Sequence, residues 1–185
     1  MTNLYRYGGI AASVILIAIG LGCVYMGVDG RSTVRTDLAR EQIVGTDDST
    51  IPGQKVDTGS EAKAFAAVMR KHTLEATGGQ TYSEMARFLD ASGKPTADEG
   101  AAAKDAKTGQ PVENPARNIW ISSTAFQTAL NTAYFAESVA TFVLVIGVAL
   151  LLVGVGLLVL ALGLLNRRPA MATVPAAREA APGAV

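Results

Sequence analysis

The chain has 185 residues, a formal net charge of zero and 49% hydrophobic side chains. A neutral chain without a long basic run lacks the attraction for phosphate backbones that nucleic-acid binding requires, so we exclude nucleic acid as a partner. The single cysteine, Cys23, excludes a disulfide within the chain.

The first apolar run, residues 8–28, holds no charged side chain. About 20 apolar residues are enough for a helix to cross the hydrocarbon core of a bilayer. We therefore predict a transmembrane helix at 8–28, preceded by a cytoplasmic tail at 1–7. No A-x-A-like cleavage site follows, which favours a retained anchor over a signal peptide. One alternative stays open, because Gly20-Leu21-Gly22-Cys23 resembles a bacterial lipoprotein box, with Gly20 where Leu or Val is usual. Lipidation of Cys23 is therefore undecided.

The middle segment, residues 29–134, carries twelve Lys and Arg against fourteen Asp and Glu, a net charge of −2. We predict that it is extracytoplasmic and mainly helical. Apolar spacing predicts a helix at 60–76, with Ser60 capping it and Gly78-Gly79 ending it. We interpret residues 83–89 as another short helix and residues 33–43 as a charged helical continuation of the first span. Residues 54–56 could pair only briefly as a strand, and the Pro- and Gly-rich stretch 93–116 is predicted to be a linker or disordered.

Residues 138–165 form a second charge-free run, and we predict a transmembrane helix at 135–165. No proline lies between residues 118 and 165, so the helix should begin near 118 and form a rod of about 70 Å. We expect the short helices to pack on its extramembrane part, whose apolar stripe comprises Ile119, Phe126, Leu130 and Tyr134. Residues 166–185 are predicted to be a disordered cytoplasmic tail.

These elements predict an all-α membrane protein. It has two transmembrane helices, a small and mainly helical extracytoplasmic segment, and a long continuous C-terminal helix. Arg6 in the first tail and Arg167-Arg168 after the second span place both termini in the cytoplasm by the positive-inside rule, with the spans in the plasma membrane. Three arginines beyond the first span oppose this orientation, but acidic residues accompany them: Arg31, Arg35 and Arg40 with Asp29, Asp37 and Glu41.

Small residues recur at intervals of seven in both spans. A seven-residue repeat keeps one stripe facing a partner, and small residues let membrane helices approach closely. We predict a helix-packing face made of Ser13, Gly20 and Gly27 in the first span and Ala133, Ala140, Gly147, Gly154 and Ala161 in the second. Two alternatives stay open: glycine and alanine are common here, with Gly156 and Gly163 off the stripe, and the stripe could face a different protein.

Candidate catalytic and metal-binding residues are few. His72 and Glu75 lie one helical turn apart, but two ligands on one helix do not complete a metal site, and the chain has no second histidine. We therefore predict no catalytic residue, no metal and no cofactor, and interpret His72 as a surface or capping residue. Glu137 stands at the edge of the second span and is the one candidate there for a functional carboxylate, but we expect a snorkelling or hydrated side chain instead.

Residues 72–82, which read His-Thr-Leu-Glu-Ala-Thr-Gly-Gly-Gln-Thr-Tyr, are followed by Glu84-Met85. This motif resembles the centre of a group of small two-span actinobacterial membrane proteins. Residues 33–43 and 131–135 are similar too, so the resemblance extends from residue 33 to 165. It implies no activity, because the group is uncharacterised. Such proteins are sometimes labelled aromatic-ring-opening dioxygenases. A non-haem iron site of that kind needs two histidines and a carboxylate, which this chain lacks.

We therefore expect a non-enzymatic integral membrane protein whose partners are the lipid bilayer and either another membrane protein or further copies of itself. It would serve as a structural or accessory subunit of a cell-envelope complex. The alternative is a homo-oligomeric channel or transport component. The lack of charged, Asn or Gln side chains within residues 138–165 favours the accessory subunit.

Overall fold

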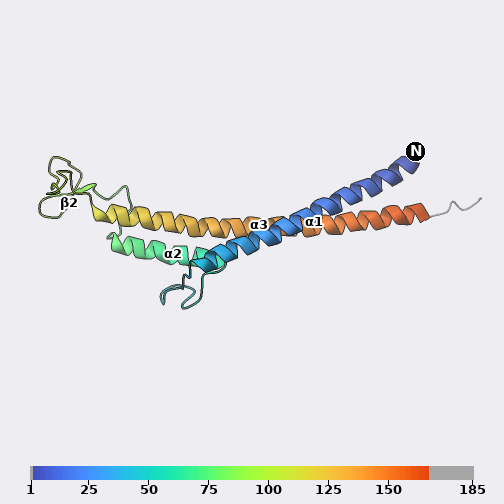
Figure 1. Ribbon diagram of the computed structural model, residues 1–185, viewed down its shortest axis with the longest axis horizontal. Coiled ribbons are helices and arrows are strands. Elements are labelled where there is room, and N and C mark those ends of the chain that lie inside the picture. Colours follow the sequence, from blue (N-terminus) through green and yellow to red (C-terminus); the bar gives the residue numbers. More distant parts are fainter. Residues whose placement is uncertain (1, 167–185) are drawn as a thin grey trace, which may run out of the picture.

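The computed structural model describes residues 2–166. It contains three helices, α1 (Thr2–Arg40), α2 (Gly59–Ala76) and α3 (Pro115–Asn166), and two short strands, β1 (Phe88–Leu89) and β2 (Pro95–Thr96). Helices α1 and α3 run side by side in opposite directions, and α2 lies against the other half of α3 (Figure 1). The prediction of a mainly helical protein with two long apolar helices is confirmed. The predicted disordered tail lies, apart from Asn166, outside the described residues.

Helices α1 and α3 are both long and apolar enough to cross a membrane. Their large apolar side chains point outward: Tyr25 is 72% exposed on α1, and Leu152 is 71% exposed on α3. Water would penalise such exposure, whereas lipid would not. Both helices continue beyond their charge-free runs without a break, because no proline interrupts either of them after its first turn.

Helix α2 starts one residue before the predicted position, and its cap is Thr58 rather than Ser60. The Thr58 hydroxyl accepts a hydrogen bond from the N–H of Glu61, whose carboxylate accepts one from the N–H of Thr58. This reciprocal pair is a capping box, which explains why Thr58 replaces Ser60 as the cap. The helix ends as predicted, with Gly78 and Gly79 at φ of 64° and 79°, where glycine is favoured.

The core outside the two apolar runs forms where α2 packs on α3 and on the end of α1. Val56 and Ala62 are fully buried here, with Leu38 and Leu130 almost so. The rings of Phe65 and Phe126 meet edge to face, with centroids 6.3 Å apart. The predicted stripe on the long helix therefore supplies part of this core.

The segment between α2 and α3 is the main departure from the sequence predictions. Residues 83 and 84 lie in a turn, residues 85–87 are irregular, and residues 88–89 form β1, so the predicted helix at 83–89 is wrong. The predicted linker at 93–116 is wrong as well, since β2 pairs antiparallel with β1 and Pro115 already begins α3. Asp90 stabilises the turn between the strands by accepting hydrogen bonds from the N–H groups of Ser92 and Lys94. Such local side-chain bonds compete with helix formation.

The loop between α1 and α2 is anchored on α2. The brief pairing predicted for residues 54–56 occurs as a bridge between Lys55 and Val44. At the loop tip, Asp48 accepts hydrogen bonds of 2.9 Å from the ammonium of Lys71 and from Thr46, and its carboxylate lies 2.9 Å from Nε2 of His72. The hydrogen bond from Lys71, with those from Thr46 and His72, holds the pKa of Asp48 well below its usual range.

Candidate functional site

The predicted small-residue stripes face each other between α1 and α3. A Cβ atom added to Gly20 would lie 2.9 Å from the carbonyl oxygen of Gly147, and one added to Gly147 would lie 2.7 Å from the backbone nitrogen of Val24. Both distances are shorter than real Cβ contacts, so the two backbones are in direct contact at this point. We call the surface that the two stripes share the glycine seam.

The glycine seam continues in both directions from Gly20 and Gly147. Toward the middle segment, a Cβ on Gly27 would lie 2.6 Å from that of Leu144 and 2.8 Å from the carbonyl oxygen of Ala140. Toward the chain ends, a Cβ on Gly154 would lie 2.8 Å from Cγ1 of Ile17.

The remaining stripe residues lie along the same seam or just beyond it. Ser13 is fully buried and donates a hydrogen bond of 2.8 Å to the carbonyl of Gly9. Ala161 is buried near Gly9, and Ala133 packs against the core beneath α2. The structure therefore brings the two stripes onto each other rather than leaving them free for a different protein.

The off-stripe glycines behave differently. A Cβ on Gly156 or Gly163 would meet no heavy atom within 4 Å among residues 7–163, whose side chains the structure describes. Close approach of the backbones therefore follows the seven-residue spacing and not glycine content alone.

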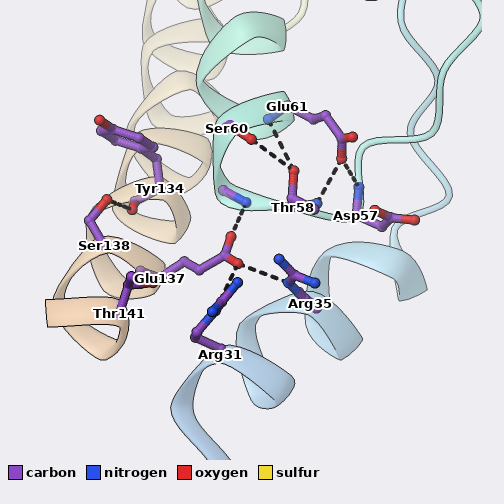
Figure 2. A network of polar contacts seen from close by, with 11 residues as sticks. Arg31, Arg35, Asp57, Thr58, Ser60, Glu61, Tyr134, Glu137, Ser138 and Thr141 are labelled. Carbon is purple, nitrogen blue, oxygen red and sulfur yellow. Dashed lines mark hydrogen bonds and ion pairs between the residues drawn. The ribbon is translucent and has the colours of Figure 1, made fainter. Parts of the chain in front are cut away.

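A buried carboxylate lies at the end of the seam, where all three helices meet (Figure 2). Glu137, directly before the second charge-free run, points from α3 toward Arg31 and Arg35 on α1. Its Oε1 accepts a hydrogen bond of 2.8 Å from Nε of Arg35 and lies 3.6 Å from Nε of Arg31. Its Oε2 accepts a hydrogen bond from the backbone N–H of Gly59 in the first turn of α2.

Our expectation that Glu137 is hydrated or snorkelling is wrong, because the residue is only 8% exposed. Antiparallel packing explains the difference. The chain leaves the first apolar run where it enters the second, so Arg31 and Arg35 lie at the same level as Glu137. A carboxylate removed from water needs such charge-assisted partners.

Gly59 fits this site because it has no side chain. A Cβ there would lie 2.9 Å from Oε2 of Glu137 and 2.9 Å from Cα of Tyr134. The N-terminus of a helix also favours negative charge through its unpaired N–H groups and its dipole. Glu137 thus joins α3 to α1 by an ion pair and to α2 by a helix-end contact.

Sequence reasoning missed this arrangement, although a signal was present. Arg31 and Arg35 are one turn apart on one helix face, just after the first apolar run, and Glu137 lies just before the second. Two antiparallel spans place these positions at equal depth. The opposite charges could therefore have been paired from the sequence.

His72 does not form a site with Glu75. Its ring nitrogen lies against Asp48 instead, on an exposed surface of α2. Among residues 2–166, no group of three or more His, Cys, Asp or Glu side chains is arranged to hold a metal ion. Cys23 is half-buried and faces the glycine seam near Gly147.

No protein-family model, curated protein or solved structure matches this chain. The resemblance to two-span actinobacterial membrane proteins therefore stays an expectation from the sequence.

Proposed function

We propose that the protein is a non-enzymatic integral membrane protein that serves as a structural or accessory subunit of a cell-envelope complex. One observation carries this proposal. Helices α1 and α3 pack against each other through their small residues, at the glycine seam, and their large apolar side chains point outward. Val159 and Leu160 are each 64% exposed, and Phe142 is equally so. An apolar surface of this kind fits lipid and other membrane helices.

The spans would lie in the plasma membrane with both termini cytoplasmic. The support is the charge of the short flanks, Arg6 on one side and Arg167-Arg168 on the other. The core around α2 and the β1–β2 turn would then stand outside the cytoplasm, carried by the protruding half of α3.

A channel of several copies is less well supported. A water-filled pore needs polar side chains along its wall, and residues 138–163 contain no charged, Asn or Gln side chain. Their only hydroxyl groups, on Ser138 and Thr141, donate hydrogen bonds back to carbonyls of their own helix. We therefore favour an accessory role.

Native mass in mild detergent, with identification of co-purifying proteins, tests this function. We expect a hetero-complex of defined mass that contains one or more other membrane proteins. A ring of identical copies would favour the channel. A monomer without partners under several mild detergents would contradict the accessory role.

A further inference from the structure

An open recess of about 390 Å³ lies beside Glu137, between the end of the first apolar run and the start of α2. Its charged lining residues are Arg31, Arg35 and Glu137, which sum to a formal charge of +1. Lys63 lies nearby, with its Nζ 4.5 Å from the ring centroid of Tyr134, another lining residue. The acidic side chains of Asp57 and Glu61 do not line the recess, and Glu61 is held by the α2 cap (Figure 2).

The two guanidinium groups are only partly used by the protein. Both direct Nε toward the same oxygen of Glu137, and the hydrogen bonds within residues 2–166 include none from their terminal Nη groups. The side chain of Arg31 is 35% exposed and that of Arg35 is 47% exposed, whereas that of Glu137 is 11% exposed. The carboxylate is thus largely buried, and both arginine side chains are partly exposed with terminal donors not used by the protein.

Four of the five hydroxyl groups that line the recess already take part in hydrogen bonds within the protein, since those of Thr58 and Ser60 are bonded to each other, and only that of Tyr134 adds to its donors. The hydroxyls of Ser138 and Thr141 donate to carbonyls of α3, as described above. The main hydrogen-bond donors of the recess are therefore the free N–H groups of two neighbouring guanidinium groups. Such an arrangement suits the oxygens of a phosphate group.

The depth of the recess distinguishes among sources of phosphate. Along α1, Arg31 lies about 5 Å and Arg35 about 10 Å beyond Val28, the last residue of the apolar run. Each headgroup layer of a bilayer is roughly 5–8 Å thick. If α1 spans a membrane, as proposed above, Arg31 lies within the layer of lipid phosphates. Arg35 lies at its outer edge, and its side chain extends back toward the layer, because its Nε is 2.8 Å from Oε1 of Glu137 directly before the second apolar run.

We infer that this recess binds the phosphate of an anionic phospholipid headgroup, held by Arg31 and Arg35. The inference rests on the proposed membrane location and adds a specific ligand to it. A net positive recess disfavours binding of a neutral headgroup relative to an anionic one. The lipid phosphate would contact Arg31 and Arg35 from the solvent side, and the carboxylate of Glu137 contacts the same two arginines from the protein side.

The test uses the full-length protein in a neutral detergent, with lipid occupancy measured by native mass spectrometry. Phosphatidylglycerol and phosphatidylcholine with identical acyl chains are titrated separately, and inorganic phosphate is added as a competitor. We expect tighter binding of phosphatidylglycerol. Arg31→Gln should weaken that binding about tenfold, the size expected for loss of one charge-assisted hydrogen bond. Arg40→Gln, an exposed arginine paired with Asp37 farther along α1, is the matched control and should bind like the wild type.

A second variant separates binding from folding. Glu137→Gln removes the internal negative charge and leaves both arginines, so it should bind phosphatidylglycerol more tightly. Weaker binding in both Arg31→Gln and Glu137→Gln would indicate a merely structural effect and would overturn the inference.

Three further results would overturn the inference: equal binding by wild type and Arg31→Gln, equal losses in Arg31→Gln and Arg40→Gln, or complete displacement of the lipid by inorganic phosphate. The last result would identify the ligand as a soluble phosphate. Membrane insertion is measured separately, by resistance to alkaline carbonate extraction, and the accessory role by co-purifying proteins. Failure of either is thereby distinguished from failure of the headgroup site.

Discussion

The carboxylate of Glu137 accepts a hydrogen bond from the backbone N–H of Gly59, which lies 78 residues earlier in the chain. The same carboxylate holds Arg35 of α1 through its other oxygen. One side chain therefore connects the three described helices at the level where α2 begins.

Replacing Glu137 by alanine should lower the free energy of unfolding by about 1–3 kcal/mol, because the N–H of Gly59 loses its partner and two arginines lose their counter-charge. The partial exposure of both arginines keeps the loss below that of a fully buried pair. Thermal unfolding in detergent measures the effect. Glu75→Ala, at an exposed position on α2, serves as the control. Equal unfolding midpoints for the two variants would contradict the proposed role of Glu137.

Replacing glycine by alanine should change the stability of the protein in opposite directions inside and outside the glycine seam. Gly147→Ala and Gly154→Ala should destabilise the protein by about 1–3 kcal/mol, because the new methyl group overlaps α1. Gly156→Ala meets open space and should be neutral or stabilising by up to about 1 kcal/mol, since alanine favours helix more than glycine does. Thermal stability of the three variants in one detergent tests this. If all three behave alike, the seam does not hold the helices together.

The seam shows which features a sequence pattern can predict. The repeat of Gly20 and Gly27 against Gly147 and Gly154 follows from helix periodicity, so the contact residues can be named from the sequence alone. The pairing of the two stripes cannot, because a stripe does not identify its partner. The charge pairing of Glu137 could likewise have been found once the two spans were paired, but its contact with the N–H of Gly59 depends on where α2 packs, which no pattern in the sequence shows.

The errors at residues 83–116 have a different cause. Short apolar spacing predicts a helix at 83–89, but the chain there pairs with later residues, as Leu89 does with Pro95 and Val112. Aspartate side chains fix the turns between these pairings, at Asp90 and again at Asp105. A composition rich in Gly, Pro and Asp is shared by disordered linkers and by such ordered turns, and composition alone does not separate them.

The contact between Asp48 and α2 should weaken in acid. The hydrogen bond from Lys71 lowers the pKa of Asp48 in the folded protein, so the folded state favours the ionised carboxylate. The contribution of this contact to stability is complete at neutral pH. It begins to fall near pH 4, about the usual pKa of aspartate in the unfolded chain, and is lost once the pH drops through the lower pKa of Asp48 in the folded protein. Hydrogen exchange of residues 45–54 should therefore rise in acid relative to that of α2. Asp48→Asn should show the faster exchange already at neutral pH. If the exchange rates of residues 45–54 in the wild type and in this variant differ by the same factor at neutral and at acid pH, the prediction is contradicted.

Purified protein should contain no stoichiometric iron or zinc. The reason is the absence, among residues 2–166, of a cluster of three or more suitable ligands. Elemental analysis by mass spectrometry of protein purified without chelators measures the metal content. Stoichiometric metal that disappears in His72→Ala would contradict this expectation and restore an enzymatic interpretation.

The orientation in the membrane is testable by cysteine labelling. In a Cys23→Ala background, Ser92→Cys in the turn between β1 and β2 should react with an impermeant thiol reagent on intact cells. Ala184→Cys, which lies outside the described residues, should react only after the cells are opened, because Arg167 and Arg168 directly after the second apolar run favour a cytoplasmic C-terminus. Labelling of the second variant alone on intact cells would reverse the proposed orientation.

Helix α3 contains neither glycine nor proline from Ala116 to Ile146, so it has no hinge between its outward-facing half and its apolar run. The distance along the helix from Pro115 to Glu137 is about 35 Å. Bilayer thinning that tilts α3 by about 10° would move its far end sideways by about 6 Å. If α3 spans a membrane, as proposed, the β1–β2 turn at that end of the helix would move sideways whenever a change in membrane thickness alters the tilt of α3 (Figure 1).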